Sequence, residues 1–519
     1  MKIKNGLAAL ALGVAIGVPL TGGAEAKNAC DNRSNNNHAK LLECVTIDGV
    51  RRHQAAWQAI ADANGGIRTS GTAGYDESAQ YVFDQLAAAG YNPVFQPFQF
   101  NTSIRLSDGA LAQIAPVASS YVFRVDYDYF SQTDAGDVTA PVEAVDLDLG
   151  LGNNSTSGCE AGDFAGFTPG SIALMQRGLC SFQLKAENAA AAGAVGAIIF
   201  NQGNTELRRG LIGGTLGNTY SGGIPVVEMT YALGEELANT PGLVLRLWVD
   251  VFRGEATTVN VIAETAGGDP DNVVMVGAHL DSVDEGPGIQ DNGTGSAAVL
   301  EVALQMAKVK PVNKVRFAWW GAEEAGLVGS RFYVADLSDE EAEDITLYLN
   351  FDMIGSPNHF FGVYDGDGSG GFPGGAGPEG SAQIEKTFED YYGALGVPSE
   401  PTDFSGRSDY GPFIAIGIPA GGLFTGAEGI KTPAQVALYG GTAGDQYDPC
   451  YHQACDTFDN INLEAFAVNS DAVAYSTLKY AMSTGSIDGS KGKGNFSERK
   501  LQMDAEMAKF EMLGSHYQQ

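Results

Sequence analysis

The sequence predicts an α/β fold built on a largely parallel sheet that helices cover on both faces. In the second half of the chain, apolar segments of strand length alternate with segments of helical length. The expected strands are 273–280, 315–322, 347–355 and 418–426. The expected helices are 294–308, 380–394 and 462–482. Strands that are apolar along their whole length, and that are joined through helices, are typical of parallel sheets buried on both faces.

The first half of the chain adds two parts to this fold. Residues 50–90 indicate helices with a break at 64–74, and the alternating pattern of 91–100 indicates a strand. Residues 140–250 differ from the rest of the chain in their short strands and many glycines. An Ala-rich helix in 180–201 leads directly into an apolar strand there. We therefore expect a smaller, β-rich unit inserted into the main fold.

Composition limits the class of partner. The chain has 519 residues, which is long for one domain, and a formal net charge of -33. Nucleic acids are bound through lysine and arginine side chains that neutralise phosphates, so a chain this acidic is not expected to bind them. The acidity suits a soluble exported protein.

The N-terminus predicts an export signal. Lys2 and Lys4 precede an apolar stretch from Leu7 to Leu20, and Ala24-Glu25-Ala26 is a small-x-small cleavage site. The apolar stretch is short and contains glycine, so a retained membrane anchor is the alternative that we do not adopt. We expect a secreted or periplasmic protein that begins near Lys27 and has no contact with the membrane after cleavage.

The six cysteines predict three disulfides. Their even number suits the oxidising compartment that an export signal implies, and the alternative is free buried thiols. Several connectivities are possible. Pairing by sequence proximity gives Cys30–Cys44, Cys159–Cys180 and Cys450–Cys455.

Ionisable side chains stand where the expected strands of the second half end. Each one alone would be interpreted as a turn, a helix cap or a solvated surface group. The carboxyl ends of parallel strands, however, line one crevice, so we expect these side chains to converge. They are His279, Asp291, Glu323, Glu324, Asp352 and His452.

Imidazole and carboxylate groups are the ligands expected for zinc, and two metal ions that share a carboxylate are a common catalytic device. Each ion needs about three protein ligands, and a water completes the site. Two histidines, two terminal carboxylates and one bridging carboxylate meet that need. The sixth side chain is then free to serve as the general base of a hydrolase.

Five motifs in this order resemble the zinc-dependent exopeptidases that include the secreted bacterial leucine aminopeptidases. They are GAHLDSV (277–283), GIQDNGTGSAAVLE (288–301), WWGAEEAGLVGS (319–330), LNFDMIG (349–355) and CYHQACDT (450–457). The resemblance covers about 260–484 and a segment around 45–100. It implies the zinc exopeptidase fold, with a mixed sheet that is parallel at its centre, and a cis peptide bond after Asp291.

The resemblance also implies two zinc ions per chain and a role for each ionisable side chain. His279 and Asp352 would hold one zinc, Glu324 and His452 the other, Asp291 would bridge both, and Glu323 would be the general base.

Four further residues are candidates for supporting roles. Asp281 would orient His279, unless it only caps a turn. Tyr451 matches the Tyr-His pair of the family and would donate its phenol to the oxyanion, unless it only packs. Arg407 would bind the substrate backbone or product carboxylate, unless it forms a structural salt bridge. Phe424 would line an apolar side-chain pocket, unless it is a core residue.

The segment DGDGSGG (365–371) has the acidic, glycine-rich character of a calcium loop. An EF-hand loop needs an acid at its twelfth position, where this chain has Ala376. We interpret the segment as a turn, with calcium as a weakly supported alternative.

The inserted unit resembles a protease-associated domain through CSFQLKAENAAAAGAVGAIIFN (180–201). Such a module brings no catalytic residues and would shape access or bind polypeptide. We expect these parts: signal peptide 1–26, catalytic domain 27–135 and 256–484, protease-associated insert 136–255, and linker with C-terminal tail 485–519.

Together these features predict an exported dizinc aminopeptidase that removes N-terminal residues, with a preference for apolar ones, from peptides and proteins. A carboxypeptidase on the same scaffold is the nearest alternative, and Arg407 would then clamp the terminal carboxylate. A non-catalytic receptor-like ectodomain is the more distant one, because it would be expected to lose metal ligands or the base. The sequence makes no prediction of oligomeric state.

Overall fold

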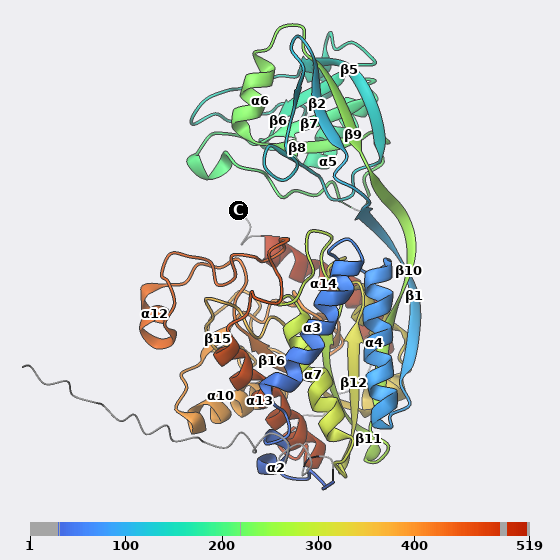
Figure 1. Cartoon of the computed structure of the whole chain (residues 1–519), viewed down its shortest axis with the longest axis vertical. Helices are drawn as coiled ribbons and strands as arrows, with labels where there is room; N and C mark the ends of the chain where they lie inside the picture. The colour runs from blue at the N-terminus through green and yellow to red at the C-terminus, as the bar shows by residue number, and fades with distance from the viewer. Residues whose placement is uncertain (1–29, 31, 218, 488–495, 516–519) are drawn as a thin grey trace, which may run out of the picture.

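The computed structural model describes residues 30, 32–217, 219–487 and 496–515. The expected signal peptide, 1–26, lies outside the described residues. Two sheets form a larger and a smaller body, which the long strands β1 (Val94–Arg105) and β10 (Val251–Glu264) join (Figure 1). These strands pair antiparallel along their length, so the chain leaves the larger body on β1 and returns on β10.

The sheet of the larger body is mixed in direction and parallel at its centre, as expected. Its strand order is β1-β10-β12-β11-β13-β16-β14-β15. The central strands β12, β11, β13 and β16 pair in parallel, whereas β10 and β14 pair antiparallel with their inner neighbours. The bounds are β11 (Asp269–His279), β12 (Asn313–Trp320), β13 (Ile345–Phe351), β14 (Gly362–Tyr364), β15 (Glu400–Thr402) and β16 (Ala420–Phe424).

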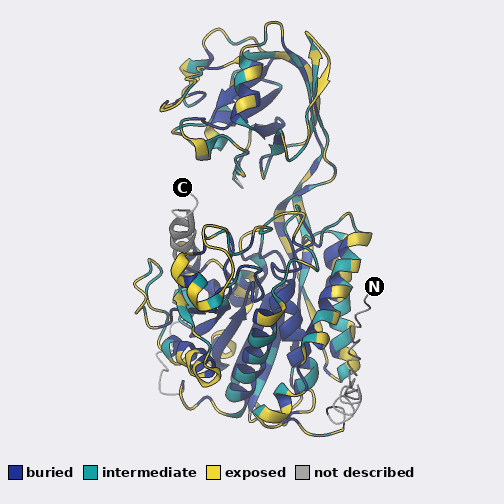
Figure 2. Cartoon of the chain, turned by 60° about the vertical axis from the view of Figure 1, so that its left-hand side comes forward, coloured by how far each residue is buried: buried dark blue, intermediate teal, exposed yellow. Residues whose placement is uncertain are grey.

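Helices cover both faces of this sheet because alternate residues of each strand point to opposite sides. In β11, Val274 and Val276 face one cluster of helices, whereas Val273 and Met275 face the other. Figure 2 shows the strands between them as buried. The first cluster contains α2 (His38–Leu42), α3 (Ile47–Ala63), α4 (Ala73–Ala89), α7 (Gly293–Met306), α10 (Ser381–Leu395) and α13 (Leu463–Met482).

The second cluster closes the opposite face of the sheet. It contains α8 (Val328–Asp336), α9 (Asp339–Asp344), α11 (Gly411–Ala415) and α14 (Phe496–Ser515). The short helix α12 (Pro433–Tyr439) lies in the loops beyond β16. Within the described ranges, no helix combines the length and the hydropathy needed to cross a lipid bilayer.

The smaller body is the β-rich unit expected between the two halves of the main fold. Its strand order is β3-β2-β9-β5-β6-β7-β8-β4, and α5 (Phe182–Ala191) and α6 (Tyr231–Ala238) pack on opposite faces. The strands are β2 (Ala110–Ala115), β3 (Ser119–Ser120), β4 (Tyr127–Tyr129), β5 (Gly136–Ala144), β6 (Ile172–Gln176), β7 (Gly196–Phe200), β8 (Val226–Met229) and β9 (Val244–Val249). Two 3-10 turns are Ala161–Phe164 and Glu206–Arg208.

The smaller sheet takes in strands that we expected in the main fold. Residues 110–129 form β2, β3 and β4, of which β2 pairs with β9 and β4 with β8. The expected boundary at 136 lies where the composition of the chain changes. The strands that pair with β2 and β4 come much later in the chain, so no local feature of residues 110–129 indicates the pairing. We propose instead that the inserted domain runs from about residue 106 to about residue 250, between β1 and β10.

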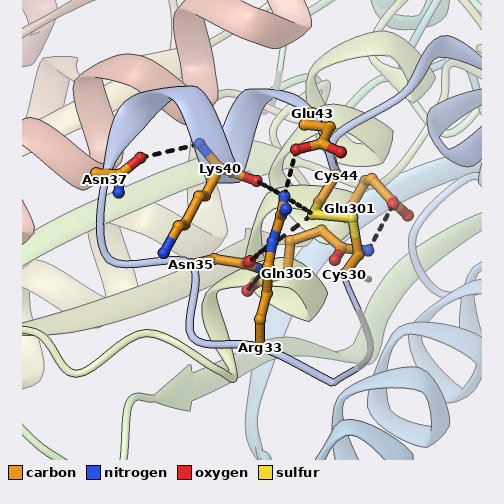
Figure 3. The surroundings of a disulfide bond; sticks show 9 residues. All are labelled: Cys30, Arg33, Asn35, Asn37, Lys40, Glu43, Cys44, Glu301 and Gln305. Carbon is orange, nitrogen blue, oxygen red and sulfur yellow. Dashed lines mark hydrogen bonds and ion pairs between the residues drawn. A yellow bond between two sulfur atoms is a disulfide. The ribbon is translucent and has the colours of Figure 1, made fainter. Parts of the chain in front are cut away.

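Three disulfides join the cysteines that are neighbours in the sequence. They are Cys30–Cys44, Cys159–Cys180 and Cys450–Cys455. Figure 3 shows the first, which ties the start of the described chain to the turn that follows α2. Beside it, Nη2 of Arg33 donates to Oε2 of Glu43 over 2.6 Å, so a hydrogen bond reinforces the same closed loop.

Candidate functional site

The carboxyl ends of three neighbouring strands bring the expected metal-binding side chains together. β11 ends at His279, β13 ends just before Asp352, and β12 ends shortly before Glu323. β11 pairs in parallel with both β12 and β13, so these ends share one edge of the sheet. Asp291 lies there just ahead of α7, and His452 reaches the same place from the loop that the third disulfide closes.

Asp291 stands between the two histidines. Its Oδ1 lies 3.2 Å from Nε2 of His279, and its Oδ2 lies 3.3 Å from Nε2 of His452. A second carboxylate approaches each imidazole: Asp352 lies 3.3 Å from His279, and Glu324 lies 3.2 Å from His452. The result is two groups, each of one imidazole and two carboxylates, that share Asp291.

These residues fit zinc. Oε1 of Glu324 and Oδ1 of Asp352 are buried and accept no hydrogen bond from the described residues. Buried carboxylate oxygens without a donor cost free energy unless a cation compensates them. Each group also offers one imidazole nitrogen and two carboxylate oxygens as metal ligands, which are the ligand types of catalytic zinc sites.

Glu323 lies beside the two groups, but the imidazole–carboxylate contacts described above are made by Asp291, Asp352 and Glu324. Its neighbour Ala322 has a φ of 53°, so the backbone has already left the strand conformation before the glutamate pair. Adjacent strand residues would point to opposite faces, but this turn allows Glu323 and Glu324 to face the same crevice. His279, Glu323 and Glu324 indeed have ligand atoms within 4.8 Å of one another.

The site is strongly negative. Burial raises the pKa of Glu323 well above its ordinary value, and Glu324 raises it further, although His279 opposes both. Burial alone would lower the pKa of His279, but the nearby Asp352 and Glu323 outweigh it and raise that pKa well above its ordinary value. The arrangement therefore stabilises positive charge at its centre, which is the electrostatic requirement of a cation site.

Asp281 lies behind His279. Nδ1 of His279 is 3.1 Å from the backbone carbonyl of Asp281 and 3.6 Å from its carboxylate. The carboxylate instead accepts the backbone N–H of Glu323 over 3.2 Å. A hydrogen on Nδ1 that points to this carbonyl leaves Nε2 free to bind a metal.

Ser408 is a supporting residue that the sequence did not reveal. Its Oγ donates to Oδ2 of Asp352 over 2.6 Å and accepts from Nδ2 of Asn350 over 2.8 Å. All three side chains are buried. Ser408 stands in the same SGRSDYGPF segment as Arg407, but no spacing rule links this loop to Asp352, which directly follows β13.

We expect Ser408→Ala to weaken zinc binding by about 10- to 100-fold, because such supporting hydrogen bonds orient a ligand and tune its basicity. Titration with a competing zinc chelator measures the change. Ser405→Ala is the control, since no described hydrogen bond joins Ser405 to a candidate ligand. Equal zinc affinity in both variants would contradict a role for Ser408.

Two further buried residues hold the backbone of the site. The carboxylate of Asp456 accepts the backbone N–H groups of Gln290 and Asp291 over 2.8 and 3.0 Å. The guanidinium of Arg68 donates to the backbone carbonyls of Leu280, Pro287 and Gly288. In the sequence, Asp456 could have been noticed because it lies within the CYHQACDT motif. Nothing in the sequence distinguishes Arg68 beyond its place in a loop. The Asp291–Asn292 peptide bond in this region is cis.

A cavity of about 990 Å³ opens onto the candidate metal-binding side chains, and Tyr451, Arg407 and Phe424 all line it. The ring of Tyr451 stacks on that of His452 at 3.9 Å between centroids. Burial raises the pKa of Tyr451 well above its ordinary value, so its phenol stays protonated and can donate a hydrogen bond.

The other two candidate residues that line the cavity are Arg407 and Phe424. Nη1 of Arg407 lies 3.5 Å from Oε1 of Glu428, so its charge already has a partner, as the salt-bridge alternative would have it. Phe424 ends β16 and lies edge-on to Phe360. Apolar side chains continue this wall of the cavity: Met353, Phe360, Phe372, Ile430 and Met507.

Comparison of the sequence with known families finds two matches. Peptidase family M28 matches residues 260–477, and the PA domain matches residues 138–237. An "Aminopeptidase" of Pseudomonas aeruginosa strain UCBPP-PA14 is 53% identical over 483 residues, which cover 92% of this chain and 89% of that protein. "Leucine aminopeptidase 2" of Trichophyton equinum is 42% identical over 86% of this chain and 85% of that protein.

Solved structures resemble the fold over most of the chain. The aminopeptidase from Aneurinibacillus sp. strain AM-1 is 28% identical, with a TM-score of 0.59 over 85% of this chain and 95% of that one. The zinc aminopeptidase BSAP from Bacillus subtilis is 25% identical, with a TM-score of 0.61 over 87% of this chain and 97% of that one.

Proposed function

We infer that this chain, which belongs to peptidase family M28 and is a zinc-dependent aminopeptidase, holds two zinc ions, is exported and prefers apolar N-terminal residues. The observation that carries the two-ion proposal is Asp291, whose two oxygens face separate imidazoles. Each imidazole has a carboxylate of its own besides, from Asp352 and from Glu324. All these ligands and Glu323 are present, which argues against a receptor-like ectodomain.

The reaction assigned to this site is the hydrolysis of the N-terminal peptide bond. Zinc held by these residues would supply Lewis acidity, which lowers the pKa of water and polarises the peptide carbonyl. Glu323 accepts the proton of the attacking water and passes it to the leaving amine nitrogen. The phenol of Tyr451 donates a hydrogen bond to the oxygen on which negative charge develops. Burial raises the pKa of Glu323, and the positive charge that zinc would supply when bound would oppose that effect and favour the ionised carboxylate.

The charge of the site favours a free amino group over a free carboxylate. Four carboxylates surround the reaction centre, and a cationic amine would be attracted to Glu323 and Asp352. Of the described lysine and arginine residues, Arg407 alone lines the cavity, and Glu428 is already its partner. A carboxypeptidase would need such a cation free to bind the terminal carboxylate.

Two observations support the finer parts of the proposal. The apolar wall around Phe424 and Phe360 suits apolar N-terminal side chains. Three disulfides suit an oxidising compartment, which together with the sequence of 1–26 supports export to the periplasm or the medium.

We expect leucyl p-nitroanilide to be cleaved at least about 100-fold faster than its N-acetylated form, because acetylation removes the cationic amine. A panel of aminoacyl p-nitroanilides should show higher kcat/KM for leucine and phenylalanine than for aspartate or glycine. Rapid release of the C-terminal residue from an N-acetylated peptide would contradict the aminopeptidase assignment and favour the carboxypeptidase. A flat side-chain profile would contradict only the apolar preference.

A further inference from the structure

Three carboxylates outside the zinc site converge beside the cavity. Asp365 and Asp367 stand in the loop that follows β14, and Glu385 projects from the start of α10. Their ligand atoms lie within 4.8 Å of one another. Asp365 and Glu385 are buried, with relative exposures of 0% and 4%, whereas Asp367 is exposed. The cluster is therefore open to solvent on one side only.

The buried carboxylate of Asp365 is only half satisfied. Its Oδ2 accepts the backbone N–H of Gly370 over 2.9 Å, but no described residue donates a hydrogen bond to its Oδ1. None of the three acids forms an ion pair with any described residue, and Lys386, the nearest lysine in the sequence, pairs with Asp390 instead. Buried negative charge without a donor or a cation is costly, so the cluster lacks a compensating positive group.

The loop has the first half of a calcium-binding pattern. In such loops, oxygen ligands come from positions 1, 3 and 5, with glycine at position 6 for the sharp turn. Here these positions are Asp365, Asp367, Ser369 and Gly370. Two backbone N–H groups of the loop already bind the two carboxylates. The N–H of Gly370 donates to Asp365, and the N–H of Ser369 donates to Asp367. This leaves the free oxygen of Asp365 available for a cation.

Glu385 replaces the acid that the loop itself lacks. At the twelfth position stands Ala376, which led us to interpret the segment as a turn. The backbone N–H of Asp367 donates to Oε2 of Glu385 over 3.0 Å, so α10 brings a carboxylate against the loop from outside it. The ligand set is then complete in space although it is incomplete in sequence.

We propose that Asp365, Asp367 and Glu385 bind a calcium ion. All of the metal ligands that the cluster offers are oxygen atoms, which favours a hard cation over zinc. Calcium accepts the irregular arrangement of carboxylates and waters that such a site offers, whereas magnesium demands near-octahedral geometry. The same loop continues to Phe372, which lines the substrate cavity, so the bound ion stabilises one wall of that cavity.

Calorimetric titration of the zinc-saturated full chain with calcium chloride, in calcium-depleted buffer, tests the site. We expect one calcium per chain and a rise in Tm of roughly 3 °C at saturation. Asp365→Asn and Glu385→Gln should each weaken calcium binding at least about 10-fold. Glu389→Gln is the matched control, since it removes a negative charge from an exposed position of the same helix and should bind calcium as the unaltered protein does.

No calcium binding by the unaltered protein would overturn the proposal, whatever happens in the variants. Unchanged affinity in both Asp365→Asn and Glu385→Gln would overturn the location. An equal rise in Tm with magnesium chloride would overturn the choice of calcium. None of these measurements uses peptide hydrolysis, so their failure is distinguishable from failure of the zinc aminopeptidase assignment.

Discussion

Replacing Glu323 with glutamine is expected to lower kcat by about 10³-fold or more while the zinc content stays unchanged. Glutamine has nearly the shape of glutamate, but it cannot accept a proton from water. The imidazole–carboxylate contacts of the site come from Asp291, Asp352 and Glu324, so this change removes none of them. The measurements are turnover of leucyl p-nitroanilide and zinc per chain by atomic absorption.

The neighbouring glutamate provides the matched control. Glu324→Gln is the same chemical change one residue along the chain, but Glu324 lies 3.2 Å from Nε2 of His452. We expect this variant to lose zinc together with activity. Turnover that persists in Glu323→Gln would contradict its role as the general base, and loss of zinc from both variants would contradict the division of labour between the two residues.

Replacing Asp291 with alanine is expected to reduce the zinc content from about two ions per chain to nearly none. Asp291 is the side chain that both groups share, since its two oxygens face His279 and His452 separately. One substitution therefore removes a ligand from each group. Zinc analysis after gel filtration, with circular dichroism to show that the chain is folded, measures the effect.

Variants that touch one group alone make this prediction specific. His452→Ala removes a ligand only from the group with Glu324, so about one zinc ion should remain. If Asp291→Ala does not fold, Asp291→Asn tests the same point with less change in shape. Retention of two ions after either Asp291 substitution would contradict the shared carboxylate, and loss of both ions from His452→Ala would show that the groups are not independent.

Much of the fold and site could be predicted because the signals are local. The strands of the parallel centre are continuous apolar runs, and β11, β12, β13 and β16 lie where these runs predict them. Four of the six candidate side chains, His279, Glu323, Glu324 and Asp352, stand at or just beyond the ends of such strands. The order of the elements brings these four to one end of the sheet. Asp291, just ahead of α7, and His452, in the disulfide loop, reach the same place from outside the strands.

Contacts between distant segments could not be predicted in the same way. Ser408 reaches Asp352, and Asp456 reaches the backbone of Asp291, only because separate loops pack together. The place of residues 110–129 in the smaller sheet was missed for a related reason, since the partners of β2 and β4 come much later in the chain. Neither composition nor periodicity carries information about such pairs.

The sequence by itself therefore determined the α/β class, the sheet that is parallel at its centre, and the identity of the six ionisable side chains. These depend on hydrophobic period and on residues next to strand ends, both of which are local. Only the tertiary structure decided which oxygen of Asp291 faces each imidazole, that the backbone turns at Ala322 ahead of the glutamate pair, and that Glu385 joins Asp365 and Asp367. Such contacts depend on where packing places segments that are far apart in the chain, because burial and backbone turns, not spacing, set which atoms meet.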